Sequence, residues 1–170
     1  MFVFEGFRRE GIQVADVTIN AMVGGSGPPL LLLHGYPQSL AMWGGIADVL
    51  AMHFTVVATD LRGYGDSSKP RCLPDCSNYS FRAMAADQVA VMQALGHQRF
   101  RLVGHDRGGR VAHRLALDHA DSVKRLAVLD ICPTSTMYAA TNQAFATAYY
   151  HWFFLIQPAD FPERMIANDT

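Results

Sequence analysis

GHDRG at residues 104–108 stands between a short apolar run, residues 100–103, and a helical pattern, residues 107–119. Its two glycines permit a tight strand-to-helix turn and close packing of the helix. Such a turn lifts its central side chain, here Asp106, above the sheet and beside a helix N-terminus, where negative charge is favoured. The pattern predicts a nucleophile turn with aspartate where serine is usual. A helix N-cap aspartate is the alternative interpretation.

Strand-like and helix-like segments alternate on both sides of this turn. A continuous apolar run at residues 30–33 suits a strand buried on both faces of a sheet, and the segments at residues 54–59, 100–103 and 123–129 indicate three further buried strands. An alternating segment at residues 12–19 suits an edge strand, and helical patterns cover residues 39–52, 81–95 and 107–119. This alternation predicts an α/β fold with a parallel sheet.

The pattern changes after the fourth of these runs. Residues 144–156 are helical and rich in aromatic side chains, a second helix begins near Phe161, and no buried strand follows. We therefore expect a sheet core over residues 1–133 and the start of an inserted helical lid over residues 134–170. An incomplete lid and an incomplete sheet indicate a truncated product or a fragment.

The charge composition of the chain argues against nucleic acids and membrane surfaces as binding partners. Charged residues make up 17% of the 170 residues and the net charge is −1, whereas nucleic-acid or membrane-surface binding needs a basic excess. No apolar stretch approaches the length of a membrane span, and we expect no signal peptide. Cys72, Cys76 and Cys132 lack the spacing of a metal site, so we expect three free thiols in a reducing cytoplasm.

A second motif, HGYP at residues 34–37, directly follows the first apolar run. In this class of fold, that loop donates one backbone N–H to an oxyanion hole and the residue after the nucleophile donates the other. The backbone N–H groups of Tyr36 and Arg107 are therefore the predicted donors. An ordinary His-Gly turn is the alternative, and we expect His34 itself to be structural rather than a base.

HGYP, DLRGYGDSSKP at residues 60–70 and GHDRGGR at residues 104–110 resemble the α/β-hydrolase superfamily. The resemblance covers residues 4–168 and points to the branch with an aspartate nucleophile, which holds haloalkane dehalogenases, epoxide hydrolases and fluoroacetate dehalogenases. It is closest to the fluoroacetate dehalogenases, through Asp106, Arg107, Arg110, Asp130, His151 and Trp152. The resemblance implies a catalytic histidine beyond residue 170, which this sequence lacks, and commonly a homodimer.

The replacement of serine by aspartate has a chemical reason. Attack by serine on a saturated carbon would leave an ether that water cannot cleave. Attack by Asp106 leaves an ester, and water can hydrolyse it at the carboxyl carbon of the enzyme itself. Substrates that react at saturated carbon, such as haloacids, haloalkanes and epoxides, therefore fit better than acyl esters.

Two arginines separate these candidate substrates. Cations in the first helical turn oppose the helix dipole, so Arg107 and Arg110 are unfavourable there unless they bind an anion. They can hold a carboxylate by paired hydrogen bonds, and the matching arginines of fluoroacetate dehalogenases bind the substrate carboxylate. The alternative for Arg110 is an ion pair with Asp87 or Asp118.

The remaining candidates depend more on the resemblance. His151 and Trp152 match a pair whose N–H groups stabilise the departing halide, although simple packing of the lid is the alternative. Asp130 follows the strand at residues 123–129, where an acid can orient a catalytic histidine or merely end a strand. None of the seven histidines is a good base candidate, and chain order in the superfamily places that residue last.

These observations predict a haloacetate dehalogenase that acts on a small haloacid without cofactor or metal. An epoxide hydrolase is the alternative enzyme. A non-catalytic fragment is the alternative of a different class.

Overall fold

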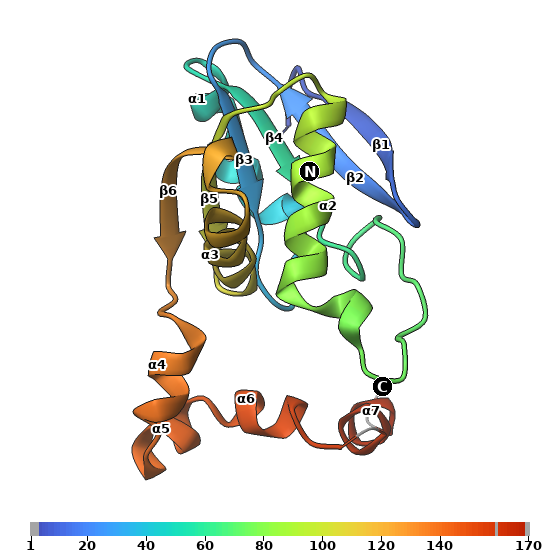
Figure 1. Cartoon of the computed structure of the whole chain (residues 1–170), viewed down its shortest axis with the longest axis vertical. Coiled ribbons are helices and arrows are strands. Elements are labelled where there is room, and N and C mark those ends of the chain that lie inside the picture. Colours follow the sequence, from blue (N-terminus) through green and yellow to red (C-terminus); the bar gives the residue numbers. More distant parts are fainter. Residues whose placement is uncertain (1–3, 159, 169–170) are drawn as a thin grey trace. The chain divides into compact units, whose positions relative to one another are not determined.

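The computed structural model describes residues 4–158 and 160–168, and the chain divides into two compact units, Met1–Ile131 and Cys132–Thr170. The first unit contains a six-stranded sheet with the strand order β1-β2-β4-β3-β5-β6 (Figure 1). The strands are β1 (Arg8–Val14), β2 (Val17–Gly24), β3 (Pro29–Leu33), β4 (Thr55–Thr59), β5 (Phe100–His105) and β6 (Val123–Leu129). β3 to β6 run parallel, as predicted, and the first two strands make the sheet mixed.

The first strand expected from the sequence is wrong. Residues 12–19 belong to a hairpin of β1 and β2, in which Val14 pairs with Val17 and the chain reverses at Ala15 and Asp16. A two-residue turn leaves paired residues on the same face of a hairpin. The apolar residues Ile12, Val14, Val17 and Ile19 therefore alternate within each strand, and only the wider spacing between Val14 and Val17 marks the reversal.

Helices cover both faces of the sheet. One apolar cluster contains Leu31 and Leu33 and is covered by α2 (Phe81–Ala94) and α3 (Arg107–Asp118), which lie side by side in Figure 1. The other contains Leu30 and Leu32 and is covered by η1 (Leu40–Trp43) and α1 (Gly44–Ala51), which together replace the single helix expected at residues 39–52. Burial on both faces explains the uninterrupted apolar run of β3. Short turns at η2 (Ser77–Tyr79) and η3 (Ala120–Ser122) complete this unit.

The packing of α3 depends on Gly108. A Cβ atom at this position would lie 2.5 Å from the carbonyl oxygens of Leu33 and His34, closer than real Cβ atoms come to other heavy atoms. The glycine therefore allows the helix to approach the end of β3. This close approach brings the first turn of α3 next to the loop that follows β3.

β6 occupies residues 123–129 as predicted, but it is not the buried strand that its apolar sequence indicates. Leu126, Val128 and Leu129 are 39%, 44% and 43% exposed, and β5 is its only partner strand among the described residues. The sequence shows that such a run can be buried but not whether anything covers it. β6 is thus an open edge of the sheet in the part of the chain that the structure describes.

The expectation of three free thiols is wrong for two of them. Cys72 and Cys76 form a disulfide, whereas Cys132 is free and exposed. A turn in which the Cys76 N–H donates to the Leu73 carbonyl oxygen at 2.8 Å brings the two Cα atoms to 5.2 Å. None of the described helices is long and apolar enough to cross a membrane.

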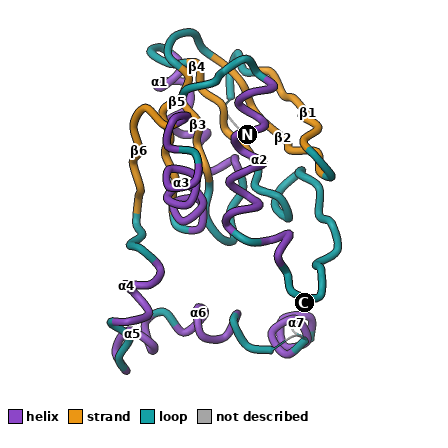
Figure 2. Tube along the Cα trace, in the orientation of Figure 1, coloured by secondary structure: helices purple, strands orange, loops and turns teal. Residues whose placement is uncertain are grey.

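The second unit contains helices and no strand among its described residues (Figure 2). The helices are α4 (Thr134–Ala139), α5 (Gln143–Ala148), α6 (Tyr150–Leu155) and α7 (Phe161–Ala167). The single helix expected at residues 144–156 is interrupted at Tyr149, whose backbone leaves the helical region with φ −115° and ψ 38°. α7 begins at Phe161 as expected, whereas α4 is not evident from the sequence.

Candidate active site

Asp106 lies in the turn between β5 and α3 and has an unusual backbone conformation. Its φ is 47° and its ψ is −113°, a region that side chains other than glycine rarely adopt and that often marks functional sites. Its N–H donates to the Leu129 carbonyl oxygen at 3.1 Å, which fixes the turn to the end of β6. Asp106 occupies the N-cap position, but its carboxylate caps no N–H of α3 among the described residues. The N-cap interpretation therefore does not explain this carboxylate.

The carboxylate of Asp106 instead binds the loop after β3. The backbone N–H of Tyr36 donates to Asp106 Oδ1 at 2.9 Å. A Cβ atom at Gly35 would lie 2.7 Å from the Cβ of Asp106, so glycine lets the loop come this close. No described residue donates a hydrogen bond to Oδ2. One carboxylate oxygen is therefore held by a backbone donor, while the other has no donor among the residues that the structure describes.

His34 holds this loop in place, as expected from the sequence. Its imidazole is fully buried, and its Nε2 accepts a hydrogen bond from the Leu61 N–H at 3.0 Å. Nδ1 lies 2.8 Å from the Gly35 carbonyl oxygen and is the donor, because a nitrogen that accepts carries no proton. Burial lowers the pKa of His34, while the bond to Gly35 and the charge of Asp60 oppose the change. A neutral, doubly bonded imidazole is structural.

Arg107 and Arg110 are both half-buried in the first turn of α3, directly after Asp106. The Arg107 guanidinium carbon lies 5.2 Å from the centre of the Phe81 ring, a cation–π contact that keeps the side chain close to α2. The structure thus places two cationic residues at the start of the helix that follows Asp106.

The two acids considered as partners for Arg110 are each bound by other arginines. Asp87 is buried and makes two bonds of 2.7 Å to Arg62. Asp118 accepts from Arg82 at 2.8 Å and also pairs with Arg114. These two bound arginines lower the pKa of Asp118 to about 2.

Asp130 directly follows β6, and the β5–β6 pairing places it near the nucleophile turn. Its φ is 53° and its side chain is 88% exposed. Asp130 Oδ2 lies 3.9 Å from His105 Nε2, while Nδ1 of the same ring is 3.1 Å from Gln38 Oε1. His105 thus lies between Asp130 and the loop after β3. We did not expect this role, because the contact depends on the register that pairs His105 with Leu129.

The loop after β4, which contains the DLRGYGDSSKP motif, also approaches the site. The Tyr64 ring is 5.2 Å from the His34 ring. Burial raises the pKa of Tyr64, and the nearby charge of Arg107 opposes that rise. The signal in the sequence is the DLRGYGDSSKP motif at residues 60–70, which gives no indication of where its side chains lie.

Asp60 fixes this loop to its surroundings. Its buried carboxylate accepts hydrogen bonds from the Asn20 side chain at 2.8 Å, the Leu40 N–H at 2.7 Å and the Asp66 N–H at 2.9 Å. These bonds link the β1–β2 hairpin, η1 and the loop after β4. Asp60 is therefore a structural acid beside the site rather than a reacting group.

His151 and Trp152 belong to the second unit and are described within it. The Trp152 ring is buried against Tyr138, Phe145 and Tyr149, with ring centres 5.7, 5.9 and 6.2 Å apart. His151 is half-buried, with its ring 6.2 Å from Tyr149. Packing thus accounts for much of the Trp152 surface, as the alternative interpretation supposed.

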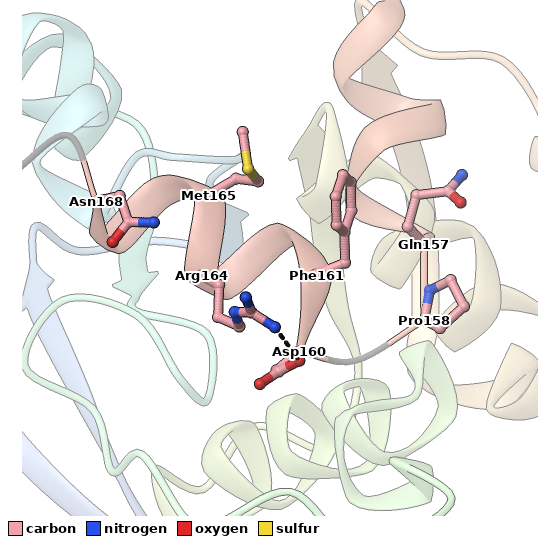
Figure 3. Close-up of a pocket in the computed structure, with 7 residues that line it drawn as sticks. All are labelled: Gln157, Pro158, Asp160, Phe161, Arg164, Met165 and Asn168. Carbon is pink, nitrogen blue, oxygen red and sulfur yellow. Dashed lines mark ion pairs between the residues drawn. The ribbon is translucent and has the colours of Figure 1, made fainter.

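The second unit also has an open hollow of about 430 Å³ around the start of α7 (Figure 3). Asp160 and Arg164 form an ion pair of 3.9 Å at its rim. It is lined by Gln157, Pro158, Asp160, Phe161, Arg164, Met165 and Asn168. None of the predicted site residues lines it. Among the described residues, no group of three or more His, Cys, Asp or Glu side chains is arranged to hold a metal ion.

Known proteins resemble most of this chain. Fluoroacetate dehalogenase from a Burkholderia species is 61% identical over 98% of this chain and 55% of its own length. Soluble epoxide hydrolase from a Corynebacterium species is 46% identical over 64% of this chain and 36% of its own length. The crystal structure of ALR0039 from Nostoc matches 96% of this chain and 56% of its own with 60% identity and a TM-score of 0.94.

The chain therefore spans 55% and 36% of the lengths of these two curated relatives. The family described as alpha/beta hydrolase fold matches residues 28–168, which include the loop after β3, the Asp106 turn and most of the second unit. The chain belongs to the alpha/beta hydrolase fold family and is close to fluoroacetate dehalogenase.

Proposed function

We propose that this chain is part of a hydrolase that removes halide from a haloacetate through an ester on Asp106. The observation that carries the proposal is the Asp106 carboxylate itself, raised on a strained turn and bound through Oδ1 by the Tyr36 N–H. Oδ2 attacks the carbon that bears the halogen, the carbon–halogen bond breaks, and halide leaves with the electron pair. The likeness to a fluoroacetate dehalogenase supports this choice of substrate.

Hydrolysis of the ester uses the bond from Tyr36. Water attacks the carboxyl carbon of Asp106, and the negative charge that develops on Oδ1 faces the Tyr36 N–H. The backbone N–H of Arg107 is the proposed second donor. The bond between this carbon and Oδ2 then breaks, which releases glycolate and restores the carboxylate.

Arg107 and Arg110 are the proposed binders of the substrate carboxylate. Their place in the first turn of α3, directly after the proposed nucleophile, supports this role. A bound carboxylate would offset the unfavourable interaction of two cations with the helix dipole.

Several further parts of the proposal rest on the resemblance. A histidine later in the longer protein activates the water, and Asp130 orients it. His151 and Trp152 donate to the departing halide from a helical lid formed by the second unit. The enzyme uses no cofactor or metal and forms a homodimer. We also propose a cytoplasmic location, which the free Cys132 supports and the Cys72–Cys76 disulfide does not.

An epoxide hydrolase is the second candidate function. The likeness to a soluble epoxide hydrolase favours it, and the same aspartate ester serves both reactions. An epoxide is neutral and needs donors to its ring oxygen, so Arg107 and Arg110 would have no carboxylate to bind. A non-catalytic role for the 170-residue chain is the third possibility.

The nucleophile can be tested in a longer protein that contains this chain. With enzyme in excess over fluoroacetate, one turnover in ¹⁸O-labelled water should place the label in the peptide that contains Asp106. The control is Asp106→Asn, which should release no fluoride. Label confined to glycolate, with none in that peptide, would overturn the proposal.

A further inference from the structure

The loop between β4 and α2 holds a pair of cysteines that the proposed hydrolysis does not use. Cys72 and Cys76 are exposed, the structure joins them by a disulfide, and their Cα atoms lie 5.2 Å apart. This Cα separation suits a disulfide without movement of the backbone. We propose that Cys72 and Cys76 form a reversible thiol–disulfide site that exchanges with small-molecule disulfides of the glutathione class.

Hydrogen bonds that do not involve sulfur hold the two cysteines close. Asn78 Oδ1 accepts from the Leu73 N–H at 3.1 Å, and Asn78 Nδ2 donates to the Arg71 carbonyl oxygen at 3.0 Å. Cys72 lies between these two bonded residues. The Cys76 N–H donates to the Leu73 carbonyl oxygen at 2.8 Å. The backbone at both cysteines is therefore fixed by bonds that can persist when the thiols are reduced.

The two side-chain hydrogen bonds of Asn78, to Leu73 and Arg71, form a clamp on the cysteine loop, and this clamp is attached to the buried core. The Asn78 carbonyl oxygen accepts a hydrogen bond from Arg62 Nη1 at 3.0 Å. Arg62 is buried and makes two bonds of 2.7 Å to the buried carboxylate of Asp87. Because the loop is held at this point, closing the short ring between the cysteines costs little additional chain entropy. A pre-organised dithiol of this kind outcompetes two separate thiols for a disulfide bond.

The exchange balances as two successive displacements. One cysteine thiolate attacks the small disulfide and expels one thiolate, which leaves a mixed disulfide on the protein. The other cysteine thiolate attacks the sulfur of the first and expels the second small thiolate. Two protein thiols are thus oxidised by two electrons and one small disulfide is reduced to two thiols. The exposure of both cysteines gives the reagent access.

The test uses the 170-residue chain, equilibrated over a range of ratios of reduced to oxidised glutathione. Free thiols are then blocked with N-ethylmaleimide, and the tryptic peptide 72–82, which contains both cysteines, is measured by mass spectrometry. We expect one transition between a doubly blocked and an unblocked peptide. The exposed single thiol Cys132 should form only a mixed disulfide with glutathione and serves as the internal reference.

Three outcomes would overturn the proposal. Both thiols could react with N-ethylmaleimide at every ratio of reduced to oxidised glutathione, which would mean that no disulfide forms. Each sulfur could carry glutathione independently of the other. The disulfide could also persist when reduced glutathione is in large excess. Asn78→Ala tests the clamp, because it removes two hydrogen bonds that each change an equilibrium about fivefold. The equilibrium constant for closure should fall by about five- to thirtyfold.

A matched control exists in the second unit. Asn142 Oδ1 accepts from the Phe145 N–H at 2.9 Å, so Asn142→Ala removes a similar bond without touching the cysteine loop. It should leave the equilibrium unchanged. Unfolding the unmodified chain in guanidinium chloride should lower the closure constant as Asn78→Ala does, even where that variant fails to fold. Equal constants in the folded and unfolded chain would contradict pre-organisation by the clamp.

Discussion

Tyr36 and Asp106 lie 70 positions apart in the sequence, yet the backbone N–H of the first donates to Oδ1 of the second at 2.9 Å. The bond uses a main-chain donor, so any residue except proline can provide it at position 36. It also makes the two oxygens of the Asp106 carboxylate unequal. Whatever reaction occurs here, the loop after β3 and the turn after β5 act as one unit.

This relationship predicts a strong effect of Gly35→Ala. The added Cβ would meet Asp106 Cβ at 2.7 Å, so the loop must withdraw and the Tyr36 N–H with it. Loss of one such donor commonly costs about 10²–10³ in kcat. Gly45→Ala is the control, because nothing lies within 4 Å of a Cβ there. Fluoride release by the two variants of the longer protein makes the comparison, and equal rates would mean that the loop position is not critical.

Substrate class is tested by Arg110→Leu in the longer protein. A charge-assisted contact to the substrate carboxylate is worth about 1.5–3 kcal/mol, or roughly ten- to 150-fold in turnover. Turnover of haloacetates should fall by that factor while neutral epoxides or haloalkanes are much less affected. Arg114→Leu removes an arginine that pairs with Asp118 on the same helix and should change neither class selectively. A loss shared equally by charged and neutral substrates would favour the epoxide hydrolase.

Stabilisation of the departing halide is tested by Trp152→Phe, which keeps an aromatic ring in the cluster and deletes the indole N–H. Fluoride depends more on hydrogen bonding as it leaves than chloride does. Turnover of fluoroacetate should therefore fall more than that of chloroacetate, by up to about tenfold for one lost bond. Tyr149→Phe keeps the neighbouring ring and is the control for packing. An equal loss with both halides would indicate that Trp152 acts only through packing.

The local parts of the site were predictable, because their signals lie within a few residues of one another. The apolar run before GHDRG and the helical pattern after it identify the Asp106 turn, and the HGYP motif identifies the Tyr36 donor. Contacts set by strand register were not predictable. His105 meets Asp130 only because β5 pairs with β6 as it does, and no spacing in the sequence encodes that contact.

Other errors have equally specific causes. The turn at Ala15 and Asp16 was missed because the same apolar alternation continues on both sides of it. Cys72 and Cys76 are expected to be free because they lack the spacing of a metal site and a reducing cytoplasm is assumed. The bonds that bring them together are made by the side chain of Asn78, which lies outside the CxxxC pattern.

Neutral, buried His34 makes the stability of the chain depend on pH. Burial lowers its pKa below the ordinary 6.5, so below about pH 6.5 the unfolded chain takes up a proton that the folded chain does not. The free energy of unfolding therefore keeps its full value above pH 6.5 and decreases as the pH falls, by up to about 1.4 kcal/mol per pH unit. The free energy of unfolding of His34→Gln, measured by chemical denaturation, should therefore depend less on pH between pH 7 and pH 5 than that of the unmodified chain. The exposed His53→Gln should keep the original slope, and identical slopes in all three proteins would contradict the assignment.

The last prediction concerns the 170-residue chain. If water activation needs a histidine from later in the longer protein, this chain can complete the first displacement but not the second. Incubation with chloroacetate should then leave one carboxymethyl ester on the Asp106 peptide, detectable by mass spectrometry, and Asp106→Asn should leave none. A general base commonly contributes about 10²–10⁴ in rate, so glycolate beyond one equivalent should be absent on the same timescale. Sustained release of glycolate would instead place the base within the chain. Because His34 is buried and bonded through both ring nitrogens, His105 beside Asp130 would then be the first residue to replace.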